Sequence, residues 1–372
     1  MNGTNMNMSA THAFYNNLRD IVDNGKEIDV RGNKTKELLS RTIKIVDPLR
    51  RCYVLPHRND NIFGKIAETL WMIKGRHDIG WLKYYLPRAP EFSDDGKTWR
   101  GAYGPRLRNW NGHTNKVDQI KNVVELIKED KFTRRAVMSM WDPSEDIVDS
   151  KDIPCNNWVH FFVRDFPAGI WDNGRYASSE MVDALYMNVT QRSCDILWGY
   201  SGIDTFAWSV LHQMMAYWTG CKVGEFSHFI SSLHLYERHY KRAEKILDAR
   251  IMKTLYQYGY KTPEFSTSIH DIDKKLRQVF VMENMVRIGH IKDVKVKAIK
   301  DDFLRVCFQM LQLYIMDNKY DDVNMTKSYL FELPDCDFKV AAIAYYIRKY
   351  PDLATSIEMS REDEAMYNKL CV

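Results

Sequence analysis

Cys155 and the motif QRSCD at residues 191–195 are the parts of this sequence best suited to covalent chemistry. Cys155 follows Ile153-Pro154 and stands at the head of an apolar segment, residues 158–163. The second motif places an arginine, a hydroxyl and a carboxylate within five positions. A cysteine attacks as its thiolate, and a nearby guanidinium stabilises that form. The two segments predict a nucleophile with a cation beside it, provided that the fold brings them together.

Other charged residues have a functional and an ordinary interpretation. Glu68 lies near the apolar face of a predicted helix over 61–74, where it either holds a proton at raised pKa or faces solvent. Arg31 lies in the loop VRGNKT at 30–35, which suits a phosphate, although an exposed turn explains the same composition. Arg134 and Arg135 precede a predicted strand and are surface residues unless a phosphate needs several donors.

Four further positions have two interpretations as well. His234 and Tyr236 share one face of a predicted strand over 225–236, where such residues are more often packed than functional. Asp204 begins a strongly apolar helix, residues 205–219, and an N-cap is its simplest role. We expect His160, in the strand after Cys155, to be a packed core residue.

Composition limits the class of protein. The chain has 372 residues, of which 45% are apolar, so it can bury a large core. A net charge of +4 permits an anionic small molecule and requires neither nucleic acid nor membrane. The seven cysteines are scattered and odd in number, which fits a reducing compartment. We find no signal peptide and no apolar run of about 18 residues. We therefore expect a cytoplasmic protein.

The periodicity predicts an α+β protein. Helices are expected over 11–22, 61–74, 117–129, 205–219 and 237–251, and strands over 136–141, 158–164, 185–191 and 225–236. Residues 96–110 have the composition of a recognition loop. After about residue 262 amphipathic helices follow one another, at 272–288, 298–317 and 338–350. We therefore predict a catalytic domain over 1–262 and a helical C-terminal extension over 263–372.

The order of these motifs resembles the thymidylate synthase superfamily over roughly residues 10–250. Seven motifs carry the resemblance, namely ETLW at 68–71, YG at 103–104, RR at 134–135 before WDP at 141–143, IPC at 153–155, QRSCD at 191–195, GEF at 224–226 and HLY at 234–236. The resemblance implies a thymidylate synthase-like fold, a mixed β-sheet flanked by helices. It also implies 5,10-methylenetetrahydrofolate as co-substrate, a homodimer and no metal.

The resemblance assigns each motif a role. Cys155 is similar to the nucleophile that adds to pyrimidine C6, and Glu68 to the carboxylate that orders water and moves protons. Residues expected to bind the nucleotide are Arg31, Arg192 and Ser193 at the phosphate, Arg134 and Arg135 at the phosphate of the other subunit, and His234 and Tyr236 at the sugar hydroxyl. Residues expected on the folate side are Asp195, Trp71 and Tyr103.

The chemistry implied by the family explains these residue types. Attack by Cys155 at C6 makes C5 nucleophilic enough to take the one-carbon unit. Arginines would hold the phosphate, place C6 over sulfur and help to keep Cys155 ionised. An exocyclic methylene then remains at C5. Hydride from the folate gives a methyl group, whereas water gives a hydroxymethyl group.

Departures from the family pattern bear on the substrate. If one residue is inserted within 199–203, Asp204 stands where the family has an asparagine that reads uracil. A protonated Asp204 can donate to cytosine N3 and accept from N4, and an ionised one can read N3-protonated cytosine. The same change marks phage deoxycytidylate hydroxymethylases. Asn156 replaces the usual histidine after the nucleophile, and His160 replaces a glutamine.

Two more departures concern the reaction and the sugar. Residues 86–92 replace the tryptophan-containing segment that shields the methylene in methylases, which favours attack by water. Ser193 leaves less room near the ribose than alanine would, which favours a deoxyribonucleotide.

We therefore predict a folate-dependent deoxycytidylate 5-hydroxymethyltransferase, located in the host cytoplasm if a phage encodes it. Alternatives within the class are a deoxyuridylate hydroxymethylase, a thymidylate synthase and a CMP hydroxymethylase. An alternative from another class is a nucleotide- or RNA-binding regulator that has lost turnover. The expected partners are a pyrimidine nucleoside monophosphate and a second copy of the chain, which lends Arg134 and Arg135, rather than a membrane or nucleic acid. Whether Val372 closes over the folate stays open.

Overall fold

The structure is a computed structural model that describes residues 5–113, 115–167, 171–172, 175–176, 180–250, 253–353 and 367. The chain forms two compact units. The first comprises Met1–Arg51 and Glu68–His239, and the second comprises Cys52–Ala67 and Tyr240–Val372. The division predicted after residue 262 concerns which residues carry activity, and it stays a prediction. Val372 lies outside the described residues.

A mixed sheet forms the centre of the first unit, as predicted. Its order is β1 (Asn5–Asn7), β3 (Asn33–Ile45), β12 (Lys222–Tyr236), β10 (Met181–Gln191), β7 (Asn156–Pro167) and β6 (Val137–Ser139). Off this path, β2 (Lys26–Val30) pairs with β3, and β11 (Cys194–Asp195) pairs with β12. β10 is parallel to β12, whereas β3–β12, β7–β10 and β6–β7 are antiparallel. Two small ribbons accompany the sheet, β4 (Trp110–Asn111) with β5 (Lys116–Val117) and β8 (Trp171–Asp172) with β9 (Arg175–Tyr176).

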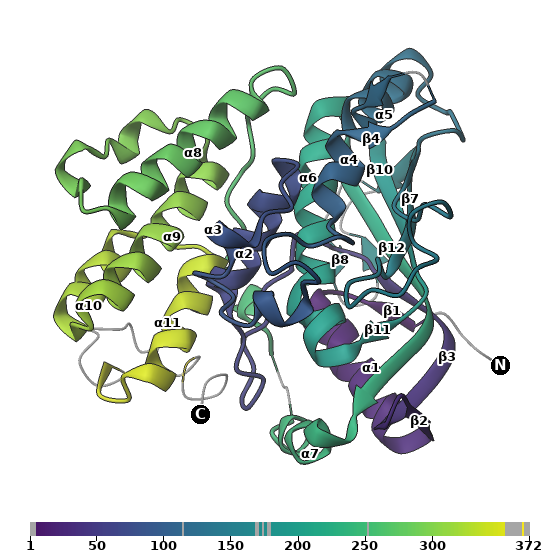
Figure 1. Cartoon of the computed structure of the whole chain (residues 1–372), viewed down its shortest axis with the longest axis horizontal. Helices are drawn as coiled ribbons and strands as arrows, with labels where there is room; N and C mark the ends of the chain where they lie inside the picture. Colours follow the sequence, from purple (N-terminus) through teal and green to yellow (C-terminus); the bar gives the residue numbers. More distant parts are fainter. Residues whose placement is uncertain are drawn as a thin grey trace. The chain divides into compact units, whose positions relative to one another are not determined.

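Helices pack against this sheet because alternate strand residues are apolar. The helices of the first unit are α1 (Ala10–Asn24), α3 (Ile79–Leu82), α4 (Tyr103–Arg108), α5 (Gln119–Glu129) and α6 (Thr205–Thr219), and α1 and α6 lie against the sheet (Figure 1). Val159, Phe161 and Val163 alternate along β7 and are fully buried. Phe161 lies 6.2 Å from the ring of His212 on α6, which places this face of β7 against α6.

The opposite face of the sheet presents aromatic side chains that are partly exposed. Trp158 and Phe229 are 38% and 36% exposed. Phe162 stacks on Tyr186 of the neighbouring strand at 5.4 Å. His160 shares this face and is half-buried, so it is not the buried core residue that its isolated position in a strand led us to expect.

The second unit is helical. It contains α7 (Tyr240–Asp248), α8 (Ile272–Arg287), α9 (Asp302–Tyr320), α10 (Val323–Glu332) and α11 (Asp337–Lys349). Phe63 contacts the rings of Tyr314 and Tyr345 at 5.2 and 5.0 Å and fixes α9 and α11 to each other. Helix α2 (Ile62–Ile73) contributes residues to both units. Among the residues that the structure describes, no helix is long and apolar enough to cross a membrane.

The predicted elements agree with the structure where burial is strongly periodic. α6 spans the predicted residues 205–219, while the loop predicted over 96–110 contains α4, and β2, β3 and α10 were not predicted. β3 alternates poorly because many of its side chains are polar and part-exposed. Asp204 is not an N-cap: its backbone is already helical, and its side chain makes no capping hydrogen bond.

Candidate active site

One cavity of about 330 Å³ in the first unit gathers nine of the thirteen predicted site residues. These nine are Cys155, Glu68, Asp204, Ser193, Asp195, His234, Tyr236, Trp71 and Tyr103. They come from segments up to about 170 positions apart in the chain, and they bring a thiol, carboxyls, a hydroxyl and aromatic rings to one space. Such a combination suits covalent chemistry on a flat, polar ring.

Sheet pairing brings the nucleophile and the QRSCD motif together. Cys155 directly precedes β7, and Gln191 ends β10, which runs antiparallel beside it with Gln191 opposite Asn156. The backbone N–H of Arg192 donates to the carbonyl of Cys155 at 2.9 Å. β11 then pairs with β12, which places Asp195 opposite His234. The sequence predicted that these segments meet, and the strand register is the reason that they do.

The Arg192 guanidinium lies against the loop that carries the nucleophile. Its Nε donates to the carbonyl of Pro154 at 2.9 Å, and its Nη2 donates to that of Ile153 at 3.0 Å. Arg192 lowers the pKa of Cys155, but burial has the larger effect and raises that pKa to about 11. The expected effect of the arginine therefore has the right sign, but burial outweighs it in the chain without ligands, in which Cys155 is a thiol at neutral pH.

Ser193 lines the cavity, but none of the four arginines predicted at the phosphate is among its described lining residues. Arg31 is exposed in the tight turn between β2 and β3, with φ 54°, and Gly32 follows with φ 75°. Such a turn needs a residue that tolerates positive φ, as glycine does. Arg134 and Arg135 are exposed immediately before β6. Their roles at a phosphate stay predictions.

The surroundings of Glu68 raise the pKa of its carboxyl strongly. Burial, followed by the carboxyls of Asp204 and Asp152, raises its pKa to about 8. Of the two interpretations that its helix pattern allowed, proton storage and exposure to solvent, the structure supports the first. A neutral Glu68 can donate a hydrogen bond into the cavity at neutral pH.

Asp204 is buried in the cavity wall, and its surroundings explain its raised pKa. Burial raises its pKa, while the side chains of Gln191, Cys194 and Asn156 lower it by smaller amounts. Cys194 Sγ lies 3.6 Å from its Oδ2. Gly199 also packs closely against Asp204, since a Cβ built at position 199 would lie 3.1 Å from Asp204 Oδ2. The carboxyl thus has a fixed position in a crowded, polar pocket.

A π-helical segment, Ile196–Asp204, carries Asp204 to this position. A π-helical turn holds about one residue more than an α-helical turn, so it absorbs a single insertion without changing the flanking elements. This geometry agrees with the one-residue insertion that we assumed within 199–203.

Two buried amides behind Asp204 were not in the predicted site. Asn156 and Gln191 are fully buried, and their amide groups lie near enough to the Asp204 carboxyl to lower its pKa. The backbone N–H of Asn156 donates to the Tyr103 hydroxyl at 3.2 Å. Their positions beside Cys155 and Arg192 in the sequence were a signal for both. Asp152, also missed, lines the cavity three residues before the nucleophile.

The walls of the cavity fit a folate. Trp71 meets Trp99 edge to face at 5.6 Å, and Trp208 and Tyr103 lie 5.7 Å apart, so aromatic rings border the space. Asp195 Oδ1 accepts the N–H groups of Leu197 and Trp198 in the first turn of the π-helix, whereas its buried Oδ2 has no partner among the described residues. That oxygen can accept from an N–H of a pterin ring. Although residues 86–92 lack a tryptophan, Trp99 and Trp208 supply indoles here.

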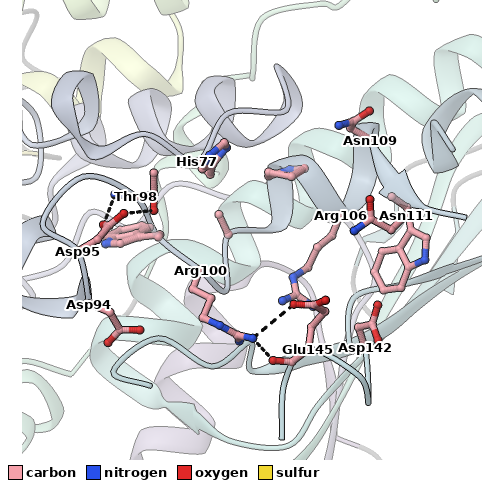
Figure 2. Close-up of a pocket in the computed structure, with 14 residues that line it drawn as sticks. His77, Asp94, Asp95, Thr98, Arg100, Arg106, Asn109, Asn111, Asp142 and Glu145 are labelled. Atoms are coloured by element: carbon pink, nitrogen blue, oxygen red, sulfur yellow. Dashed lines mark hydrogen bonds and ion pairs between the residues drawn. The ribbon is translucent and has the colours of Figure 1, made fainter. Parts of the chain in front are cut away.

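A second cavity of about 410 Å³ shares Trp99 and Ala102 with the first (Figure 2). Its cations are already paired: Arg106 binds both oxygens of Asp146 at 2.7 Å, and Arg100 approaches the same carboxylate at 3.5 Å. No cysteine is among its described lining residues. Although this cavity is the larger, the chemistry assigns the site to the cavity that contains Cys155.

Comparisons with known proteins agree with this geometry. A family model described as thymidylate synthase matches residues 12–278. The deoxyuridylate hydroxymethyltransferase of Bacillus phage SP01 is 27% identical over 385 aligned positions, which cover 95% of each chain. Proteins of the same name from Delftia phage PhiW-14 and Pseudomonas phage M6 are 31% and 32% identical, over 60% and 54% of this chain and 60% and 52% of their own.

These matches support a pyrimidine hydroxymethylase or a thymidylate synthase-like reaction, with 5,10-methylenetetrahydrofolate as co-substrate. The relatives leave open which pyrimidine base this chain takes. The chain belongs to the thymidylate synthase family, and it is a one-carbon transferase that acts on a pyrimidine nucleotide.

Proposed function

We propose that this protein is a deoxycytidylate 5-hydroxymethyltransferase. The observation that carries the proposal is the position of Asp204, a buried carboxyl of raised pKa in the cavity wall that also holds Cys155. A neutral carboxyl has one donor and one acceptor, and it matches the N3 acceptor and the N4 amino donor of cytosine. Buried polar groups that a wrong base leaves unpaired provide strong discrimination.

The residues act in the following order. Arg192 and Ser193 bind the phosphate, and His234 with Tyr236 binds the sugar hydroxyl, which places pyrimidine C6 next to Cys155 Sγ. Cys155 gives up its thiol proton to water as the sulfur bonds to C6, and the C5–C6 electron pair moves to C5. Bound methylenetetrahydrofolate supplies a one-carbon unit at the oxidation level of formaldehyde. After C5 has taken this unit and lost its proton, water adds to the exocyclic methylene, and the C6–Sγ bond breaks.

The neutral Glu68 acts on the ring as a proton donor. With a pKa of about 8 it carries a proton at neutral pH and can hydrogen-bond to the oxygen or water beside the pyrimidine. General acid catalysis of this kind contributes about 10²- to 10⁴-fold. The indoles of Trp71 and Trp99 border the same space and limit how much bulk water enters.

Deoxyuridylate is the second candidate, because three relatives are named for it. A neutral Asp204 with its proton on the other oxygen can donate to uracil O4 and accept from N3–H. An ionised Asp204 cannot donate, so it opposes uracil O4 with a second acceptor. Uracil therefore requires the protonated form, whereas cytosine can also be read by an ionised Asp204 when its own N3 is protonated.

Substrate competition between dCMP and dUMP tests the assignment. The wild-type protein should release the C5 proton faster from dCMP, and Asp204→Asn should move the ratio of kcat/KM values toward dUMP by about 10-fold or more. Asp23→Asn, an exposed change on α1, is the matched control and should leave the ratio unaltered. If Asp204→Asn keeps the wild-type preference for dCMP, Asp204 does not read the base. If the wild-type protein releases no C5 proton from either nucleotide, the chain is a binding protein instead.

We further propose that the protein is a homodimer. The aromatic face of the sheet, with Trp158, Phe162 and Phe229, is partly exposed, and isologous pairing of such a face buries it on both subunits. Arg134 and Arg135 stand exposed at the start of β6, at the edge of this sheet. That position lets a second copy carry them toward the phosphate of its neighbour.

A further inference from the structure

We propose that Asp152 is the general base that takes a proton from the water attacking the exocyclic methylene. This inference rests on the proposed hydroxymethylation and deepens it. Asp152 lines the cavity together with Cys155 and Glu68, and no role was assigned to it from the sequence. Its carboxyl lies on the short loop that leads into the nucleophile, so it is held close to the reacting carbon atoms.

Hydrogen bonds fix the carboxyl of Asp152. Its Oδ2 accepts the backbone N–H of Gly101 at 2.8 Å. Its own backbone N–H donates to Ser150 Oγ at 3.1 Å, and this hydroxyl donates to Asp94 at 2.6 Å. Lys151 N–H donates to the same Asp94 carboxylate at 3.0 Å. The residues before Asp152 are therefore anchored, the Ile153 and Pro154 carbonyls after it are held by Arg192, and one carboxyl oxygen of Asp152 is oriented by a backbone donor.

Gly101 is what allows the close approach. A Cβ at this position would lie 3.0 Å from Asp152 Oδ1 and 3.0 Å from the backbone nitrogen of Pro154. Any larger side chain would push the carboxyl or the nucleophile loop away. Oδ1 makes no hydrogen bond to the residues that the structure describes, so this oxygen is available to a water molecule.

Glu68 and Asp152 divide the roles of acid and base between them. Two carboxyls in one cavity do not ionise together easily, and Asp152 is one cause of the raised pKa of Glu68. Burial raises the pKa of Asp152 as well, and the N–H of Gly101 and the guanidinium groups of Arg106 and Arg100 offset part of this rise. The fixed carboxyl of Asp152, whose Oδ1 is available to water, takes the role of base, and Glu68 takes the role of acid.

The step balances without any further reactant. The water oxygen bonds to the methylene carbon while its proton passes to Asp152. The methylene electron pair moves into the ring, re-forms the C5–C6 double bond and expels Cys155 as thiolate. Asp152 then returns its proton to that thiolate, whose high pKa favours the thiol. The product carries a hydroxymethyl group, and both enzyme groups regain their starting forms.

Single-turnover kinetics of Asp152→Asn test the proposal. Release of the C5 proton from dCMP should stay within about threefold of wild type, because it precedes the attack of water, whereas formation of hydroxymethyl product should fall about 100-fold or more. The exocyclic methylene should accumulate, and 2-mercaptoethanol should capture it as a thioether. Asp149→Asn, an exposed change in the same loop, is the control and should leave both rates unaltered. Asp152→Glu should restore part of the product rate.

The outcomes separate this proposal from the proposed function. If Asp152→Asn slows proton release and product formation by the same factor, Asp152 is only structural, and the proposal is overturned. It is also overturned if the product rate is unaltered and no thioether forms. If the wild-type protein yields no hydroxymethyl product from dCMP or dUMP, the proposed function itself fails, whatever the variant does.

Discussion

At the scale of single residues, burial determines the chemistry of this site more than charge does. Cys155, Glu68 and Asp204 all have raised pKa values, and burial is the largest cause for each. Glu68 and Cys155, with pKa values of about 8 and about 11, are therefore mostly protonated at pH 7 in the free protein. Burial thus favours the neutral forms in this cavity, which suits a substrate that brings its own charge, the phosphate, and whose ring is read by hydrogen bonds.

The first prediction concerns the reactivity of Cys155. Its alkylation by iodoacetamide should be slow at pH 7 and should rise with pH toward about 11, because only the thiolate reacts. Arg192→Gln removes the cation that lowers this pKa. At a fixed pH it should slow alkylation roughly three- to tenfold, the effect of half to one pKa unit. Mass spectrometry of the peptide that contains Cys155 measures the rate. An unaltered rate in the variant would show that Arg192 does not act on the thiol.

The second prediction concerns stability and Glu68. Its pKa is about 8 in the folded protein and about 4.5 in the unfolded chain, so the folded state binds the extra proton between these pH values. This group therefore lowers the free energy of unfolding as the pH rises, by about 1.4 kcal/mol per pH unit within that window. Glu68→Gln should gain stability relative to wild type between pH 5 and pH 8. Urea denaturation of both proteins at pH 5 and pH 8 measures their free energies of unfolding. If the variant and the wild type differ by the same amount at both pH values, Glu68 is not buried as described.

At the scale of elements, strand register and one irregular helix assemble the site. The pairing of β7 with β10 brings Cys155 beside Arg192, and the π-helix turns Asp204 into the cavity. The sequence predicted the apolar strand β7 and helix α6 because their burial is periodic. It could not predict β3, whose side chains are largely polar, or the buried amide of Gln191 beside Asp204, which depends on contacts between distant segments.

The candidate site residues, like the elements, could be predicted from the sequence only in part. The order of the motifs identified nine residues that the structure gathers in one cavity. Asp152 carries no pattern that distinguishes it from a loop residue, so only the cavity identified it. The sequence predicted the effect of Arg192 on the pKa of Cys155 but not the larger effect of burial, because a sequence shows which charges are near but not how deeply a thiol is buried.

The third prediction tests the π-helix. Deletion of Gly202 should convert the segment Ile196–Asp204 to an α-helix and rotate Asp204 by roughly 100° about the helix axis. The variant should fold, with a circular dichroism spectrum like that of wild type, and should lose the discrimination between dCMP and dUMP. Ser201→Ala keeps the length and is the control. A deletion variant with the wild-type substrate ratio would show that the extra residue does not position Asp204.

At the scale of the whole molecule, a relative shares the helical C-terminal part of the chain as well as the catalytic fold. The family match ends at residue 278, but the relative from Bacillus phage SP01 aligns over 95% of this chain. Most of the C-terminal helices therefore have counterparts in that protein. The catalytic unit keeps one aromatic sheet face partly exposed, which is the surface expected to pair in a dimer.

The fourth prediction tests whether each active site of the dimer uses arginines from the other subunit. Cys155→Ser subunits and subunits with both Arg134→Ala and Arg135→Ala should each be inactive or nearly so. Mixing them under conditions that exchange subunits should restore turnover, because one site of each mixed dimer then has the intact thiol and intact arginines from its partner. Light scattering should show a dimer throughout. Two inactive variants that stay inactive as proven mixed dimers would contradict the donation of arginines across the interface.

The most direct test of the central claim is the mass of the product formed from dCMP and 5,10-methylenetetrahydrofolate. The account predicts dCMP that has gained one CH2O unit at C5, formed faster than any product from dUMP and absent with Cys155→Ser. A product that has gained only a CH2 unit, or turnover confined to dUMP, would contradict it.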